Sequence, residues 1–177
     1  MERDEIRMAG WGAGIVFALV LAVTAAPVAW AGDRPDPART PGAINPAVTQ
    51  ANIHRTICVP GYSRGVRPPY AYTKALKLRQ LGGDRRTWRY EEDHLIPLSL
   101  GGAPRDPRNL WPEPWHGRWG AHTKDRLELK LYHLVCAGRL PLAEARTAIA
   151  RDWIAAYRRF CPTRSDCPSW RELHGRE

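Results

Sequence analysis

The sequence has few cysteines, no closely spaced cysteine pair and no internal repeat. Its 177 residues include four Cys and no C-x-x-C motif, which argues against a zinc knuckle. The lack of any repeat of 20–50 residues excludes solenoids and propellers. With 44% hydrophobic and 25% charged residues, the chain is not extensively disordered. Its length allows one ordinary domain and a short additional segment.

Acidic residues are scarce relative to basic ones. Asp and Glu number 18 against 27 Lys and Arg, giving a formal net charge of +9. Only four of the basic residues are Lys, so 23 are Arg. This bias fits either the codon usage of a GC-rich genome or selection for phosphate contacts. The charge predicts a polyanionic partner, either nucleic acid or an acidic envelope polymer.

The N-terminal segment is apolar and is expected to lie outside the fold. Residues 9–31 carry no charge and end in Ala29-Trp30-Ala31, a small-x-small pattern typical of signal-peptide cleavage sites. We therefore predict a signal peptide over residues 1–31 and a secreted or periplasmic mature protein. The mature chain would keep 25 basic and 15 acidic residues, a net charge of +10. Because the leading residues are not clearly basic, an uncleaved membrane anchor over residues 9–31 is the alternative.

The even number of cysteines suits an oxidising compartment. Cys58, Cys136, Cys161 and Cys167 predict two disulfides, for which three pairings exist. The short polar loop between Cys161 and Cys167 favours local closure, which leaves Cys58 to pair with Cys136.

The rest of the chain predicts a small α+β domain. Four prolines make residues 32–46 an expected linker, followed by a domain over 47–177. A helix is expected over 71–81, with Ala71, Ala75, Leu78 and Leu81 on its apolar face. Residues 88–111 predict two short strands around a long loop that contains Gly101-Gly102.

Two longer helices should follow the strands. From Ala121 onwards, an apolar stripe of Leu127, Leu131, Leu134 and Val135 predicts a helix that ends before Gly138. A second amphipathic helix is expected over 142–160, and the tail after Cys161 is short and polar.

The residues that suggest chemistry lie around the predicted strands. Asp93 and His94 are adjacent, so the carboxylate could hold a divalent cation while the imidazole takes a proton from water. Asn109 follows the Gly-Gly loop, and its side chain could hydrogen-bond across the loop and fix its shape. Glu91 and Glu92 precede this pair and are expected to be solvated, with a contribution to the metal's field as the alternative.

The stretch DHLIPLSLGGAPRDPRNLW, residues 93–111, resembles the HNH family of ββα-metal endonucleases. In that family an Asp-His pair opens the first strand, a Gly-rich loop follows, and an Asn-Leu pair begins the second strand. The resemblance covers about residues 88–136 and implies a ββα core with flanking helices. The remaining parts are similar to exported bacterial HNH-like proteins of unassigned role.

The resemblance also implies roles for individual residues. His94 matches the general base, Asp93 the metal ligand and Asn109 the residue that orients the loop. His122 lies where some members place a helix ligand, and Lys124 would contact phosphate or the transition state. Helical geometry turns His122 away from the leucine stripe, so His116 or Asp125 is the alternative ligand.

Function, cofactor and partner follow from the same resemblance. The implied activity is phosphodiester hydrolysis by a divalent metal, Mg²⁺ in first place, with Mn²⁺, Ni²⁺ or Zn²⁺ as alternatives. DNA is the expected substrate rather than RNA. Backbone contacts are expected from Arg85, Arg86, Arg89 and Arg118. Because the third metal ligand is undetermined, the alternative is a non-catalytic module that binds nucleic acid or another polyanion on a degenerate HNH fold.

Overall fold

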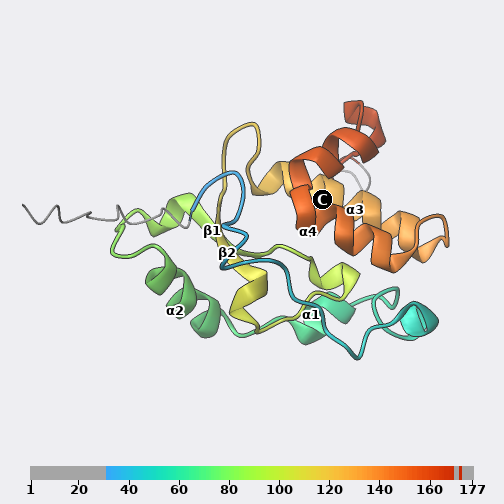
Figure 1. Cartoon of the computed structure of the whole chain (residues 1–177), viewed down its shortest axis with the longest axis horizontal. Coiled ribbons are helices and arrows are strands. Elements are labelled where there is room, and N and C mark those ends of the chain that lie inside the picture. Colours follow the sequence, from blue (N-terminus) through green and yellow to red (C-terminus); the bar gives the residue numbers. More distant parts are fainter. Residues whose placement is uncertain (1–30, 170–171, 173–177) are drawn as a thin grey trace, which may run out of the picture.

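The structure is a computed structural model that describes residues 31–169 and residue 172. It shows an α+β domain in which a two-stranded antiparallel sheet lies among helices (Figure 1). The predicted α+β class is therefore confirmed. The main elements are α1 (Tyr62–Val66), α2 (Tyr70–Gln80), β1 (Tyr90–His94), β2 (Leu110–Pro114), α3 (Ala121–Cys136) and α4 (Leu142–Phe160).

The two strands form an antiparallel pair that is followed directly by α3. Tyr90 pairs with Pro114 at one end, and His94 pairs with Leu110 at the other. The loop between the strands contains a short 3-10 turn over Leu98–Leu100. The predicted pair of strands around a long loop is thus present, although the first strand begins only after the exposed Trp88.

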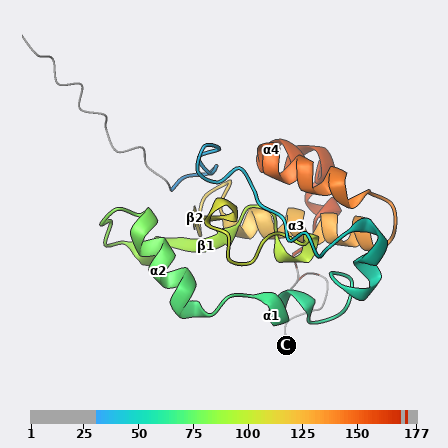
Figure 2. The same ribbon diagram turned by 60° about the horizontal axis from the view of Figure 1, so that its bottom comes forward.

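Helices α3 and α4 lie side by side and supply much of the core (Figures 1 and 2). Leu127, Leu131 and Val135 of α3 are fully buried, as the periodic stripe predicts. Ile149 and Trp153 provide the buried face of α4. The bounds of α4 coincide with the predicted range because its apolar periodicity is strong and Phe160 is its last periodic residue.

The predicted inner face of α2 is wrong. Leu78 is 49% exposed, and the buried side chains are Leu76 and Gln80. Polar contacts explain the difference, because Gln80 Nε2 donates to the Leu110 carbonyl and Lys77 Nζ donates to the Tyr90 carbonyl. These bonds rotate the 76–80 row of the helix toward the strands.

The proline-rich segment 32–46 is packed on the domain and is not a free linker. Thr40 is fully buried and donates to the Leu110 carbonyl, and Ile44 forms an antiparallel bridge with Gly102. The Trp153 indole donates to the Asp33 carbonyl at 2.8 Å. The segment therefore forms part of the folded domain.

Two disulfides connect the predicted cysteines. Cys58 is joined to Cys136, and Cys161 is joined to Cys167. Such bonds are typical of an oxidising, extracytoplasmic environment. Over the described residues, no helix has both the length and the apolar character needed to cross a membrane. The predicted signal peptide or anchor lies outside the described residues, except for its last position.

Candidate functional site

Asn109 holds the loop between β1 and β2 in a tight conformation. Its buried side chain accepts from the Ile96 amide at 2.9 Å and donates to the Ile96 and Ala103 carbonyls at 3.0 and 3.2 Å. Gly102 passes so close that a Cβ there would lie 2.7 Å from Asn109 Nδ2. Gly101 has a φ of +71°, which favours glycine. The Gly-Gly pair and the asparagine thus shape one loop together, with the bonds that the sequence suggests.

His94 ends β1 and is almost completely buried. Its Nε2 lies 3.0 Å from the Pro104 carbonyl oxygen, which can only accept, so Nε2 carries the proton. Nδ1 is then the nitrogen with the lone pair. Burial lowers the pKa of His94, although the neighbouring Asp93 works in the opposite direction. A neutral imidazole of fixed tautomer is the form that a general base requires.

Lys124 on the first turns of α3 reaches the end of β1 and is fully buried. Its Nζ lies 2.5 Å from Asp93 Oδ2 and 2.8 Å from the His94 carbonyl oxygen, and it also bonds to Glu128 Oε1. Burial opposes the charge on Lys124, but these carboxylates raise its pKa well above the usual value. Burial likewise works to raise the pKa of Asp93, and the Lys124 ammonium brings it below its usual range.

Further carboxylates surround this ion pair. Glu91 and Glu113 are directly opposite each other in the strand register, on the same face as Asp93. Burial raises the pKa of Glu91 to about 7, and nearby Asp93 and Asp125 add to the effect. Burial also raises the pKa of Glu113 well above its usual value. The acidic cluster therefore consists of Glu91, Asp93, Glu113 and Glu128, with Lys124 among them.

Glu92 lies on the other face of β1, toward α2. The expectation of a solvated pair is wrong for this residue, which is only 8% exposed. Neither of its carboxylate oxygens has a hydrogen-bond partner among the described residues. Burial raises the pKa of Glu92 to about 8, and Lys77 only partly opposes the shift. Strand alternation explains why adjacent glutamates enter different environments.

The described residues do not fit a divalent metal ion as they stand. They contain no group of three or more His, Cys, Asp or Glu side chains arranged to hold one. Asp93, the metal ligand that the resemblance implies, accepts through its Oδ2 from Lys124. His122 is exposed, and its ring lies 5.8 Å from that of Trp115 and 6.0 Å from that of His116. His122 lines the same pocket as Asp125 and Glu128.

Lys124 has a different environment from the one implied by the resemblance. A phosphate contact requires an accessible ammonium, whereas Lys124 has no exposed surface. All three of its protons are directed at protein oxygens. This placement corrects the expectation that Lys124 touches substrate.

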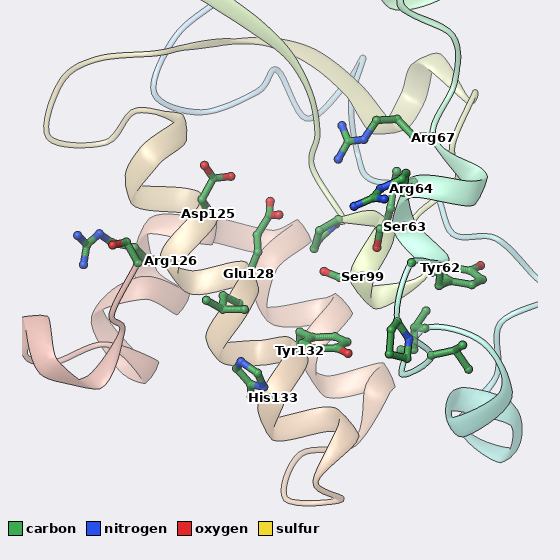
Figure 3. Close-up of a pocket in the computed structure, with 18 of the residues that line it drawn as sticks. Tyr62, Ser63, Arg64, Arg67, Ser99, Asp125, Arg126, Glu128, Tyr132 and His133 are labelled. Atoms are coloured by element: carbon green, nitrogen blue, oxygen red, sulfur yellow. The ribbon is translucent and has the colours of Figure 1, made fainter. Parts of the chain in front are cut away.

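A pocket of about 1180 Å³ opens beside the acidic cluster. Asp125 and Glu128 of α3 stand on one side, with Arg64 and Arg67 opposite (Figure 3). The wall below them includes Tyr132 and apolar side chains. The apolar part of the lining comprises Ile57, Val59, Pro60, Pro97, Leu98 and Leu129. The pocket can therefore receive a ligand that has both anionic and flat apolar parts.

The arginines selected from the sequence lie elsewhere. Arg85, Arg86 and Arg89 are exposed ahead of β1, where Arg86 pairs with Asp84 at 3.1 Å. The Arg118 guanidinium lies 5.1 Å from the Trp119 ring centre. These four arginines do not line the pocket, but their exposure leaves them able to contact an extended polyanion.

Sequence reasoning did not select Arg64 and Arg67, although a signal for them existed. The predicted Cys58–Cys136 disulfide joins the segment just before α1 to the end of α3. Any basic side chain shortly after Cys58 in the sequence would therefore lie near α3. Combining the disulfide with the charge pattern would have brought both arginines to the candidate site.

Comparisons with protein-family models, with curated proteins and with solved structures gave no match to this chain.

Proposed function

We propose that this chain is an exported nucleic-acid-binding protein, built on an HNH-like strand–strand–helix unit whose metal position is taken by Lys124. The observation that carries the proposal is the buried Lys124 ammonium, which bonds Glu128 and the Oδ2 of Asp93, the residue to which the resemblance assigns the metal. This arrangement favours binding without metal-dependent hydrolysis. It corresponds to the alternative that the sequence left open.

The geometry around the loop supports the HNH-like part of the proposal. Two antiparallel strands precede a helix, and the Asp93-His94 pair lies at the end of the first strand. Asn109 bonds across the intervening loop. The resemblance implies an Asp-His pair at the start of the first strand, so the position of Asp93 and His94 at the end of β1 departs from it, whereas the order of strand, loop, strand and helix agrees.

The pocket supplies a place for a phosphodiester backbone. Arg64 and Arg67 are exposed on the rim, and two arginines can bind phosphate oxygens with several donors each. The carboxylates of Asp125 and Glu128 would repel phosphate on the opposite side. The backbone should therefore follow the arginine rim, while a base could lie against Tyr132 and the apolar lining.

Salt-dependent binding to DNA tests the proposal. Binding of short single- and double-stranded DNA and RNA to the full chain can be followed by fluorescence anisotropy between about 50 and 300 mM salt. Affinity for DNA should fall steeply with salt because phosphate contacts release counterions. Unchanged affinity across this range, or equal binding of an unrelated acidic polymer such as polyglutamate, would contradict nucleic-acid recognition.

Paired arginine variants locate the binding surface. Arg64→Ala/Arg67→Ala should lower DNA affinity roughly 10-fold or more at low salt, because two phosphate contacts are lost. Arg139→Ala/Arg151→Ala removes the same charge from exposed positions outside the pocket and is the matched control. Equal losses in both double variants would mean that binding is not centred on the pocket.

The geometry of His94 makes endonuclease activity the second candidate. Its neutral ring and fixed tautomer suit a base that activates water. Plasmid nicking with Mg²⁺, Mn²⁺ or EDTA, comparing wild type with His94→Ala, separates the candidates. Metal-dependent nicking that His94→Ala abolishes would establish the enzyme. No nicking by either protein, or equal nicking by both, would leave the binding function.

A further inference from the structure

The charged side chains that line the pocket differ in whether they already have protein partners. Arg126 forms an ion pair with Glu172, and Glu128 accepts from Lys124. Three other charged side chains of the lining form no hydrogen bond or ion pair among the described residues, namely Arg64, Arg67 and Asp125. These three are also exposed, so a ligand in the pocket can reach them.

The unpartnered charges of opposite sign lie on opposite sides of the pocket. Figure 3 shows Asp125 on α3, with Arg64 and Arg67 across the pocket from it. Burial raises the pKa of Asp125, and the Arg67 guanidinium is one of the cations that oppose this shift. The two charges are thus within electrostatic reach of each other, but no ion pair joins them. The pocket therefore offers hydrogen-bond donors on one side and acceptors on the other.

The Asp125 carboxylate restricts the ligands that the pocket can accept. A phosphate group suits the two arginines, but a carboxylate repels it. An ionised carboxylate has acceptors only, so the part of the ligand that lies against Asp125 must carry N–H or O–H donors. Between the two walls, the Tyr132 ring and the apolar lining favour a flat group. The fitting ligand has a phosphate at one end, a flat ring, and donors at the other end.

Guanine is the nucleic-acid base that best meets these requirements. Its Watson–Crick edge carries two adjacent donors, the N1–H and the N2 amine, which match the two oxygens of one carboxylate. Adenine and cytosine place one amine beside a ring nitrogen that accepts, and thymine and uracil place one N–H between two carbonyl oxygens. Those acceptors would face the carboxylate and be repelled. Because base pairing occupies this edge in a duplex, the guanine must be unpaired.

We infer that the pocket selects guanine in single-stranded nucleic acid, with the phosphate at Arg64 and Arg67 and the Watson–Crick edge at Asp125. The base then lies against Tyr132. Asp125 is the residue that determines specificity, whereas the arginines bind every nucleotide alike. The inference rests on the proposed nucleic-acid-binding function and specifies which base the pocket takes.

Base substitutions in the ligand test the inference on the wild-type protein. Short labelled thymidine strands that carry one central guanine, hypoxanthine, adenine or thymine are bound to the full chain and followed by fluorescence anisotropy. The guanine strand should bind roughly 10-fold more tightly than the adenine or thymine strand. Hypoxanthine lacks only the N2 amine, so its strand should fall between them. Annealing each strand to its complement should remove the preference.

An isosteric variant locates the selectivity. Asp125→Asn replaces one acceptor oxygen with a donor, so the preference for guanine over thymine should fall below about 2-fold while the affinity for the all-thymidine strand is retained. Asp33→Asn makes the same change at an exposed position outside the pocket and is the matched control. A guanine preference that persists in folded Asp125→Asn would overturn the inference. If this variant does not fold, the wild-type comparison of guanine with hypoxanthine decides.

The outcomes separate this inference from the proposed function. Equal binding of all the single strands would overturn guanine selection and leave the nucleic-acid-binding function standing. Binding of no strand would contradict the proposed function itself. GMP and AMP, added as competitors, distinguish a strand from a free nucleotide. Weaker binding of GMP than of the guanine strand supports the inference, whereas equal binding would identify the free nucleotide as the ligand and overturn the assignment to a strand.

Discussion

At the scale of single residues, β1 separates two buried polar environments. Adjacent residues of a strand point to opposite faces, so Glu91 and Asp93 approach α3 while Glu92 approaches α2. Lys124 compensates the charge on the first face. On the second face, Glu92 has no hydrogen-bond partner among the described residues. The stability contributed by the two faces should therefore depend differently on pH.

Glu92 should make the protein less stable as the pH rises. Its folded pKa of about 8 lies above the value near 4.3 expected in the unfolded chain. The contribution of Glu92 to the unfolding free energy is therefore fully present below its unfolded pKa, and it is lost as the pH rises through its folded pKa of about 8. Relative to Glu92→Gln, wild type should lose on the order of a few kcal/mol of unfolding free energy between about pH 5 and pH 8.5.

Urea unfolding at a series of pH values measures this difference. Glu144→Gln, at an exposed position on α4, is the matched control for the loss of one carboxylate and should follow the wild-type profile. Parallel profiles for wild type and Glu92→Gln would show that Glu92 is already ionised in the folded protein.

Asn109 should contribute strongly to stability because its bonds are buried. Asn109→Ala leaves the Ile96 amide and carbonyl without partners, which should lower the unfolding free energy by about 2–4 kcal/mol. The control Asn45→Ala removes one exposed side-chain bond, to the Ala47 amide, and should cost less than about 1 kcal/mol. Denaturant titrations that show equal losses would mean that the loop does not depend on the buried amide.

At the scale of elements, the orientation of α2 gives a direct comparison between two leucines two residues apart. Leu76 is 4% exposed and packs inward, whereas Leu78 is 49% exposed. Leu76→Ala should therefore cost about 2–4 kcal/mol of unfolding free energy, and Leu78→Ala less than about 1 kcal/mol. If thermal or denaturant unfolding showed a larger loss of stability for Leu78→Ala than for Leu76→Ala, the inner face of α2 would be the one expected from the leucine pattern.

The helices differ in how far their sequences determine them. In α3 and α4 the apolar residues recur with a helical period over several turns, so their bounds and inner faces could be predicted. The inner row of α2 includes Gln80, which is buried because it reaches the Leu110 carbonyl. A polar residue that is buried through a partner 30 positions away leaves no trace in the local pattern.

The site shows the same division between local and distant information. The Asn109 bonds and the Gly-Gly turn depend on residues within one loop, and the sequence indicated both. The partnership of Lys124 with Asp93 spans 31 positions and depends on how α3 packs on β1. The sequence did place Lys124 near the leucine stripe, and that position is consistent with burial.

At the scale of the whole molecule, the N-terminal segment 32–46 is joined to α4 and to β2, which lie far from it in sequence. Residues 32–46 lie on the domain because Asp33 meets Trp153, Arg34 pairs with Asp152, and Thr40 meets Leu110. A proline-rich composition is the same whether such a segment is packed or free, so its docking could not be read from local sequence. The long-range disulfide adds a covalent link of the same kind.

The two disulfides should contribute unequally to stability. Cys58–Cys136 closes a loop with a sequence separation of 78, whereas Cys161–Cys167 spans only 6. Because a longer closed loop removes more entropy from the unfolded chain, Cys58→Ser/Cys136→Ser should cost about 4 kcal/mol and Cys161→Ser/Cys167→Ser about 2 kcal/mol. Chemical unfolding of the two double variants measures the difference. Each double variant is the control for the other, since both lose two sulfur atoms from a disulfide. A larger loss of unfolding free energy in Cys161→Ser/Cys167→Ser would show that local packing outweighs chain entropy.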